Sequence, residues 1–117
     1  MGTPLTLVSV DRADVAAVRD VLAPLPREGI YVRGATLLLE TSYVGAGAAD
    51  FYATAWRWSA ADAELLFALC TRGRLVLTWE STVLLCGVEA DLSDTYGSTA
   101  VRCDSVPALR EFLAAVE

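Results

Sequence analysis

The residues of this sequence that could do chemistry are its carboxylates, its cysteines and its aromatic side chains. The 117 residues include no histidine and no lysine, which excludes Ser-His-Asp triads, Ser-Lys pairs and lysine Schiff bases. No P-loop, GxGxxG or GxSxG motif occurs, and the glycine-rich stretch VGAGA at 44–48 lacks the Gly-Lys-Ser/Thr that completes a P-loop. Carboxylate acid–base catalysis stays open, with Glu40 and Glu80 as candidate acids.

The segment 87–98 (GVEADLSDTYGS) is the first candidate site. Glu89, Asp91 and Asp94 are irregularly spaced and do not match a calcium-binding loop. An acidic segment with one aromatic ring, Tyr96, suits a basic protein partner, because charge speeds encounter and the ring can fill a pocket. The alternative is an ordinary solvated loop or short strand.

The aromatic stretch 51–58 (FYATAWRW) is the second candidate. Alternation along a strand puts Tyr52, Trp56 and Trp58 on one face, with Ala53 and Ala55 on the other. The aromatic face is either core beneath helices or an exposed platform for a partner or an apolar small molecule. The alanine face would suit close helix packing, which favours the platform.

The three cysteines, Cys70, Cys86 and Cys103, each lie in an apolar run and show no CxxC spacing. We expect buried, structural thiols. With no histidine and no paired cysteine ligands, the sequence predicts neither a metal site nor a cofactor.

The net charge and the hydropathy of the chain limit the kinds of partner that it is expected to bind. Nine basic against fifteen acidic residues give a net charge of −6, and the arginines are spread along the chain. Direct binding to double-stranded nucleic acid or to anionic membranes is therefore not expected. No apolar run approaches the roughly 20 residues of a membrane span, and no basic signal-peptide region begins the sequence, so we expect a cytoplasmic protein. Lysine, asparagine and glutamine are missing and isoleucine occurs once, which indicates a GC-rich bacterial genome.

Hydrophobic periodicity predicts the elements that must position these residues. A strand at 4–10 is followed by a helix with Asp11 and Asp14 at its start, stopped by the prolines at 24 and 26. Strands at 29–33 and 35–41 follow, joined at Gly34. The same order of strand, helix and two strands then recurs.

The second unit runs from a strand at 51–58 through a helix capped by the stretch 59–62 and ended by Gly73. Strands at 75–80 and 82–89 complete it. The hairpins IYVRGATLLLE and VLTWESTVLLC align without gaps, placing Gly34 on Glu80 and Leu39 on Leu85. We expect hairpins 30–40 and 76–86 to superpose by a pseudo-twofold operation.

The predicted fold class is α+β: two βαββ units (about 4–41 and 51–89) and a C-terminal strand and helix (98–117) in one domain spanning 1–117. The sheet should be mostly antiparallel, with the helices on one face. This order is similar to that of the vicinal-oxygen-chelate proteins, which resemble bleomycin-resistance proteins and have modules that run βαβββ. The resemblance implies small-molecule binding, but the first unit lacks a clear fourth strand and the chain lacks histidine metal ligands.

Three functional hypotheses remain. The first is an immunity or inhibitor protein, a small acidic domain that neutralises a basic toxin such as a nuclease. The second is a small-molecule binding domain built from duplicated β-α modules, without metal ligands. The third is a carboxylate-dependent enzyme. The missing catalytic residues favour the first, a protein-binding domain and not an enzyme.

Overall fold

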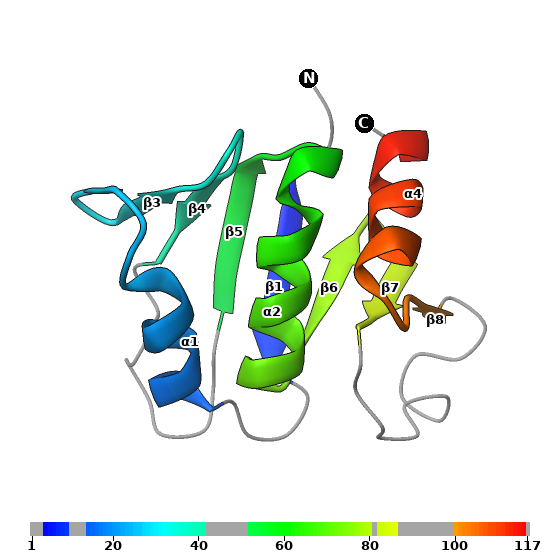
Figure 1. The fold of residues 1–117 in the computed structure, drawn as a ribbon, viewed down its shortest axis with the longest axis horizontal. Helices are drawn as coiled ribbons and strands as arrows, with labels where there is room; N and C mark the ends of the chain where they lie inside the picture. The colour runs from blue at the N-terminus through cyan, green and yellow to red at the C-terminus, as the bar shows by residue number, and fades with distance from the viewer. Residues whose placement is uncertain (1–3, 10–13, 42–51, 81, 87–99, 117) are drawn as a thin grey trace.

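A computed structural model describes residues 4–9, 14–41, 52–80, 82–86 and 100–116, which form one eight-stranded sheet and helices against it. Figure 1 shows helices α1, α2 and α4 side by side on one face of the sheet. The strands are β1 (Leu5–Ser9), β2 (Arg27–Glu28), β3 (Tyr31–Arg33), β4 (Leu38–Glu40), β5 (Tyr52–Arg57), β6 (Leu75–Trp79), β7 (Thr82–Leu85) and β8 (Ala100–Arg102). The helices are α1 (Val15–Leu22), α2 (Ala63–Gly73, preceded by the 3-10 turn Ala60–Asp62) and α4 (Val106–Val116). The predicted α+β class, with its mostly antiparallel sheet, is confirmed.

The strand order β2-β3-β4-β5-β1-β6-β7-β8 contains two interlocked βαβ units. β1 lies between β5 and β6 and is antiparallel to both. As a result, the unit β1-α1-β4 has two parallel strands, β1 and β4, with β5 between them. The unit β5-α2-β6 likewise has two parallel strands, β5 and β6, with β1 between them. This is the split βαβ, or ferredoxin-like, arrangement. The β2–β3 hairpin is added at one edge of these four strands, next to β4, and β7 and β8, with helix α4, are added at the other edge, next to β6.

The internal symmetry differs from the one expected from the sequence. An operation that exchanges β1 with β5 carries β4 onto β6, because these strands are their outer neighbours. The second strand of hairpin 30–40 thus corresponds to the first strand of hairpin 76–86, so the expected superposition of the hairpins is wrong. The sequence alignment matched hydrophobic strands but could not show which of them lies next to the centre.

Two turn positions show the same mismatch. Glu80 adopts a left-handed backbone conformation (φ 52°) in the turn between β6 and β7. Gly34, its partner in the alignment, does not; a Cβ there would lie 2.9 Å from Leu37 Cβ and 3.0 Å from Asp62 Oδ1. Glycine is needed at 34 for close packing, whereas position 80 makes a tight turn.

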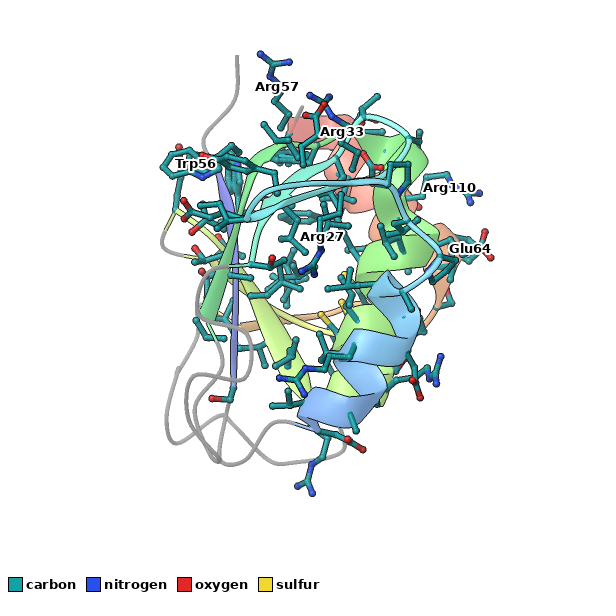
Figure 2. All side chains as sticks on the ribbon, turned by 90° about the vertical axis from the view of Figure 1, so that its left-hand side faces the viewer. Arg27, Arg33, Trp56, Arg57, Glu64 and Arg110 are labelled. Atoms are coloured by element: carbon teal, nitrogen blue, oxygen red, sulfur yellow. The ribbon has the colours of Figure 1, made fainter. Side chains whose placement is uncertain are left out.

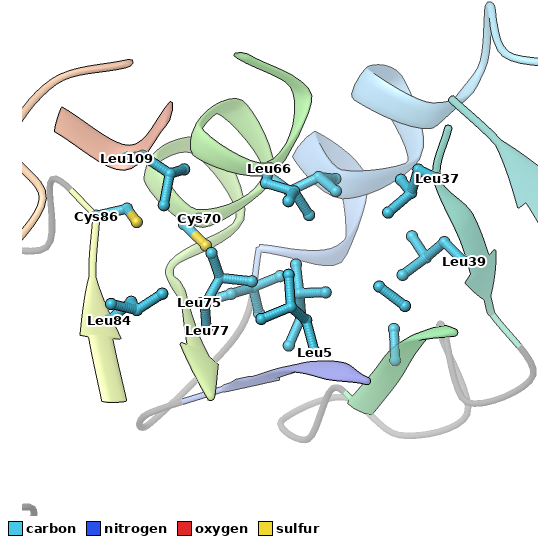
Figure 3. Packing of buried hydrophobic residues seen from close by; sticks show 14 of the residues in the cluster. Leu5, Leu37, Leu39, Leu66, Cys70, Leu75, Leu77, Leu84, Cys86 and Leu109 are labelled. Atoms are coloured by element: carbon cyan, nitrogen blue, oxygen red, sulfur yellow. The ribbon is translucent and has the colours of Figure 1, made fainter. Parts of the chain in front are cut away.

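The core lies between the sheet and its helices. Leu5 and Leu7 of β1 point to the helices and pair with Ala55 and Ala53 of β5. The small alanine side chains leave room for helices to approach the sheet. Leucines from the helices and the central strands fill the space between them (Figure 3).

Hydrogen bonds at the helix N-termini fix where the helices begin. The Asp14 carboxylate accepts from the Ala17 N–H (3.1 Å), so Asp14 caps α1. The sequence pattern predicts Asp11 as the cap, with Asp14 three residues further on; Asp11 lies outside the described residues, and Asp14 itself occupies the cap position. Before α2, the Ser59 hydroxyl accepts from Ala61 N–H and the Asp62 carboxylate from Ser59 N–H, the capping box that the sequence predicted.

The C-terminal end of α2 lies close to α1. A Cβ at Gly73 would lie 2.5 Å from the Val18 Cγ2 atom, so any larger residue there would force the side chain of Val18 or one of the helices to shift. Gly73 is the last residue of the helix, as expected, and Arg74 after it takes the left-handed conformation (φ 59°).

Candidate functional site

The acidic candidate set, Glu89, Asp91, Asp94 and Tyr96, lies outside the described residues, so its contacts stay a prediction. The position of the charge in the sequence is nevertheless informative. Six of the fifteen acidic residues and one of the nine arginines fall outside the described ranges. Three of those six acids, Glu89, Asp91 and Asp94, fall within six consecutive positions.

The second candidate set is divided by the structure. Trp56 points to the face of the sheet away from the helices and is 48% exposed (Figure 2). Trp58 follows the end of β5, is partly buried and packs against the core, so it does not share that face. Of Tyr52 only the backbone, in β5, is described. Ala53 and Ala55 are the residues beneath the helices.

The sheet face that carries Trp56 is here called the rear face. On β1, β5, β6 and β7 its described side chains are, by alternation along the strands, those of Thr6, Val8, Thr54, Trp56, Val76, Thr78 and Val83. The pairing of β5 with β4 and of β4 with β3 adds Glu40 and the half-buried Tyr31. Val76 and Val83 are buried, and Thr54 is buried as well. Among the described side chains of the rear face, that of Trp56 is the large exposed hydrophobic one. Because the register places Tyr52 on the same face and its side chain is not described, an aromatic platform here stays a prediction.

A hollow lined by arginines lies where the β2–β3 hairpin meets the end of α1. Its volume is about 410 Å³. Arg19 and Arg27 line it together with apolar side chains and Thr41. Neither arginine has an ion-pair partner among the residues that the structure describes. Figure 2 shows Arg27 at this side of the molecule. The hollow thus offers two positive charges above an apolar floor, which suits a small organic anion.

A second hollow of about 530 Å³ lies between the β3–β4 connection and α2. Its buried acid is Asp62, 1% exposed, whose oxygens accept from the Thr36 N–H (3.2 Å), the Thr36 hydroxyl and the Ser59 N–H (3.1 Å). These bonds tie the β3–β4 connection to the start of α2. Asp62 therefore has a structural role, and its oxygen atoms are engaged in these hydrogen bonds.

The two acids considered for catalysis are not brought together. Glu40 lies in β4 and Glu80 follows β6, with β5 and β1 between them. Within the described ranges, Asp62 is the one buried carboxylate. The pair of buried carboxylates that would favour the enzyme hypothesis is not formed by these residues.

The three cysteines come together in the core, although they lie on different elements. Cys70 is in α2, Cys86 follows β7 and Cys103 follows β8, and all three are buried free thiols, as expected. Hydrogen bonds join the Cys86 side chain to those of Cys103 and Cys70. Figure 3 shows the Cys70 and Cys86 sulfur atoms between α2 and β7.

These contacts make the thiols weak acids. The hydrogen bond with Cys103 lowers the pKa of Cys86, but the hydrogen bond with Cys70 and burial outweigh it and raise that pKa well above its ordinary value. The hydrogen bond with Cys86, together with burial, raises the pKa of Cys103. Both thiols are neutral near pH 7. Among the described side chains, no group of three or more Cys, Asp or Glu is arranged to hold a metal ion.

Sequence reasoning missed the arginine hollow and the cysteine cluster. The cysteine cluster joins residues that are distant in sequence, through a strand pairing that carries no local signal. The lining of the hollow is more local: it runs from Arg19 to Arg27, and Thr41 is added from the end of β4. In the described part of the chain, no helix is long and apolar enough to cross a bilayer. No protein-family model matches the sequence, and no curated protein or solved structure is significantly similar to it.

Proposed function

We propose that this chain is an acidic protein-binding domain of the immunity or inhibitor type, whose partner is a basic protein such as a nuclease toxin. The observation that carries the proposal is the distribution of charge. The chain has fifteen acidic and nine basic residues, which gives a net charge of −6. Three of those acids, Glu89, Asp91 and Asp94, fall within six residues of one another.

The chemistry of such a partner fits this distribution. A nuclease binds phosphate through clustered lysine and arginine, and a compact group of carboxylates competes for the same surface. Long-range attraction speeds association, and a ring such as Tyr96 contributes mainly by slowing dissociation. The exposed ring of Trp56 is a second anchor of the same kind.

The test starts from the neighbouring genes, because an inhibitor is commonly encoded beside the toxin that it neutralises. The basic protein encoded there is purified and assayed for nuclease activity with increasing amounts of this chain. We expect one equivalent to abolish the activity. Full activity at a large excess of the chain would contradict the proposal.

The arginine hollow favours a second candidate function, the binding of a small organic anion. The side chains of Arg19 and Arg27 would contact a carboxylate, while Leu22 and Leu25 contact its apolar part. Titration with hexanoate, followed by NMR, should give saturable shifts of the two arginine Nε–H signals. The Arg19→Gln/Arg27→Gln variant should lose the saturable shifts of the surrounding residues, and a wild-type response that never saturates would contradict the site.

A further inference from the structure

The parallel pairing of β7 with β8 brings two cysteines level with each other. Its register joins Leu84 to Val101 and Leu85 to Arg102. The next residues on the two strands are Cys86 and Cys103. Neighbouring strands lie about 4.8 Å apart, and a disulfide requires Cα atoms about 4.4–6.8 Å apart. The backbone at this point therefore has the spacing of a disulfide.

The side chains agree with the backbone. The Cys86 and Cys103 thiols are hydrogen-bonded to each other and both are buried. No charged group has to move away for a bond to form between them, because both sulfur atoms face the apolar core.

We propose that Cys86 and Cys103 form a disulfide in an oxidising environment, with a low-molecular-weight disulfide as the oxidant, while Cys70 stays reduced. Cys70 also contacts Cys86, but it belongs to α2. A helix packed on a sheet forms a separate layer, so its Cα atoms lie farther from a strand than the neighbouring strand does. A Cys70–Cys86 bond would have to draw the two layers together.

The reaction is a pair of thiol–disulfide exchanges. The Cys86 thiolate attacks one sulfur of the oxidant RSSR, forming a mixed disulfide and releasing RS⁻. The Cys103 thiolate then attacks the Cys86 sulfur of the mixed disulfide, which forms the Cys86–Cys103 bond and releases the second RS⁻. Two electrons pass from the cysteines to the oxidant, and the two thiol protons end on two RSH molecules.

Burial determines when this exchange happens. The thiolate is the attacking form, and both thiols are neutral and inaccessible in the folded protein. The exchange therefore proceeds during folding or through opening of the β7–β8 edge. Once formed, the bond closes a ring around residues 87–102 and fixes β8 and the start of α4 to β7. This inference is independent of the proposed function.

The test is refolding in a redox buffer followed by peptide mapping. The reduced chain is unfolded in denaturant, diluted into oxidised and reduced glutathione, and blocked with an alkylating reagent. Trypsin cleaves after arginine, and the sequence places the three cysteines on three separate peptides, 58–72, 75–102 and 103–110. Each possible disulfide therefore gives a different linked pair.

We expect peptide 75–102 linked to peptide 103–110, with the count of free thiols falling from three to one. The matched variant Cys70→Ala should form the same link, and Cys103→Ala should keep both of its remaining thiols free. A link through peptide 58–72, or three free thiols in the refolded wild type, would overturn the proposal. So would a Cys70–Cys86 link in Cys103→Ala at the yield of the wild-type bond.

Discussion

Helix α2 is held at its two ends by two different clusters, each built around buried side chains. At its start, Asp62 accepts hydrogen bonds from Thr36 and Ser59, which tie the helix to the connection between β3 and β4. Toward its other end, the Cys70 side chain is hydrogen-bonded to that of Cys86, which follows β7. Cys86 is hydrogen-bonded in turn to Cys103, which follows β8. Both clusters join residues far apart in sequence. Asp62 and the three thiols are buried, whereas Thr36 is exposed and Ser59 is half-buried.

The difference lies in the kind of interaction. The buried carboxylate of Asp62 accepts charge-assisted hydrogen bonds that offset its removal from water. Loss of the carboxylate or of one of its donors therefore leaves a polar group without a hydrogen bond. The thiols hydrogen-bond weakly and contribute chiefly packing volume. The Asp62 cluster should therefore matter more for stability, and the cysteine cluster should matter more for covalent chemistry.

Asp62→Ala should have the largest effect on stability. It removes an acceptor from three hydrogen bonds and breaks the capping box, at a cost of about 3 kcal/mol. Urea unfolding followed by circular dichroism measures it. Asp62→Asn keeps one oxygen acceptor without the charge and should cost less than Asp62→Ala, but more than nothing. Wild-type stability of Asp62→Asn would contradict a role for the carboxylate charge at this end.

Gly73→Ala should destabilise by about 2 kcal/mol, because the new methyl group meets Val18 where α1 and α2 approach most closely. The matched variant Gly73→Ala/Val18→Ala makes room for that methyl group. Its loss in the free energy of unfolding should be smaller than the sum of the two single losses. Strict additivity would contradict the close approach.

Cys70→Ala and Cys86→Ala should each cost only about 1 kcal/mol, the loss of a sulfur atom's packing. Urea unfolding in the presence of reductant measures both variants beside Asp62→Ala. A loss in the free energy of unfolding as large as that of Asp62→Ala would show that the thiol cluster stabilises the fold as much as the hydrogen bonds of Asp62 do.

The raised pKa values of Cys86 and Cys103 make stability fall in alkaline solution. The unfolded thiols lose their protons near the ordinary pKa of 9.0, while the folded thiols keep theirs. The stabilising contribution is thus complete below pH 9 and declines as the pH rises above it. Thermal unfolding from pH 8 to 10.5 should show a steeper decline for the wild type than for Cys86→Ala/Cys103→Ala. Parallel curves would contradict the raised pKa values.

Trp56→Ala should change stability least, by less than about 0.5 kcal/mol, since the ring is exposed away from both clusters. Its thermal midpoint checks this. A large loss would mean that Trp56 packs on structure and is not available as an anchor.

Local patterns predicted most of the elements. The capping box at 59–62, the alternation in β5 and the apolar runs around the cysteines all depend on neighbours in sequence, and all agree with the structure. The α+β class followed from the order of strands and helices.

Strand order was the part that the sequence could not supply. The hydrophobic patterns of β4, β6 and β7 are alike, so nothing local showed that β4 corresponds to β6. The same gap concealed the meeting of Cys86 with Cys103, which depends on a parallel pairing across seventeen positions. Trp58 was assigned to the face of Trp56 because the alternation was extended one residue beyond the end of β5.

The measurement that tests the proposed function most directly is the association rate with the basic partner at low and at physiological salt. Charges on the rim of an interface raise this rate, and salt screens them over roughly 8–10 Å at physiological strength. We expect Glu89→Ala/Asp91→Ala/Asp94→Ala to associate more slowly and with a flatter salt dependence. The control Asp20→Ala/Glu64→Ala/Glu111→Ala removes the same charge from exposed helix positions and should behave more like the wild type. Equal rates and equal salt dependence for the two triple variants would contradict a binding role for the acidic segment.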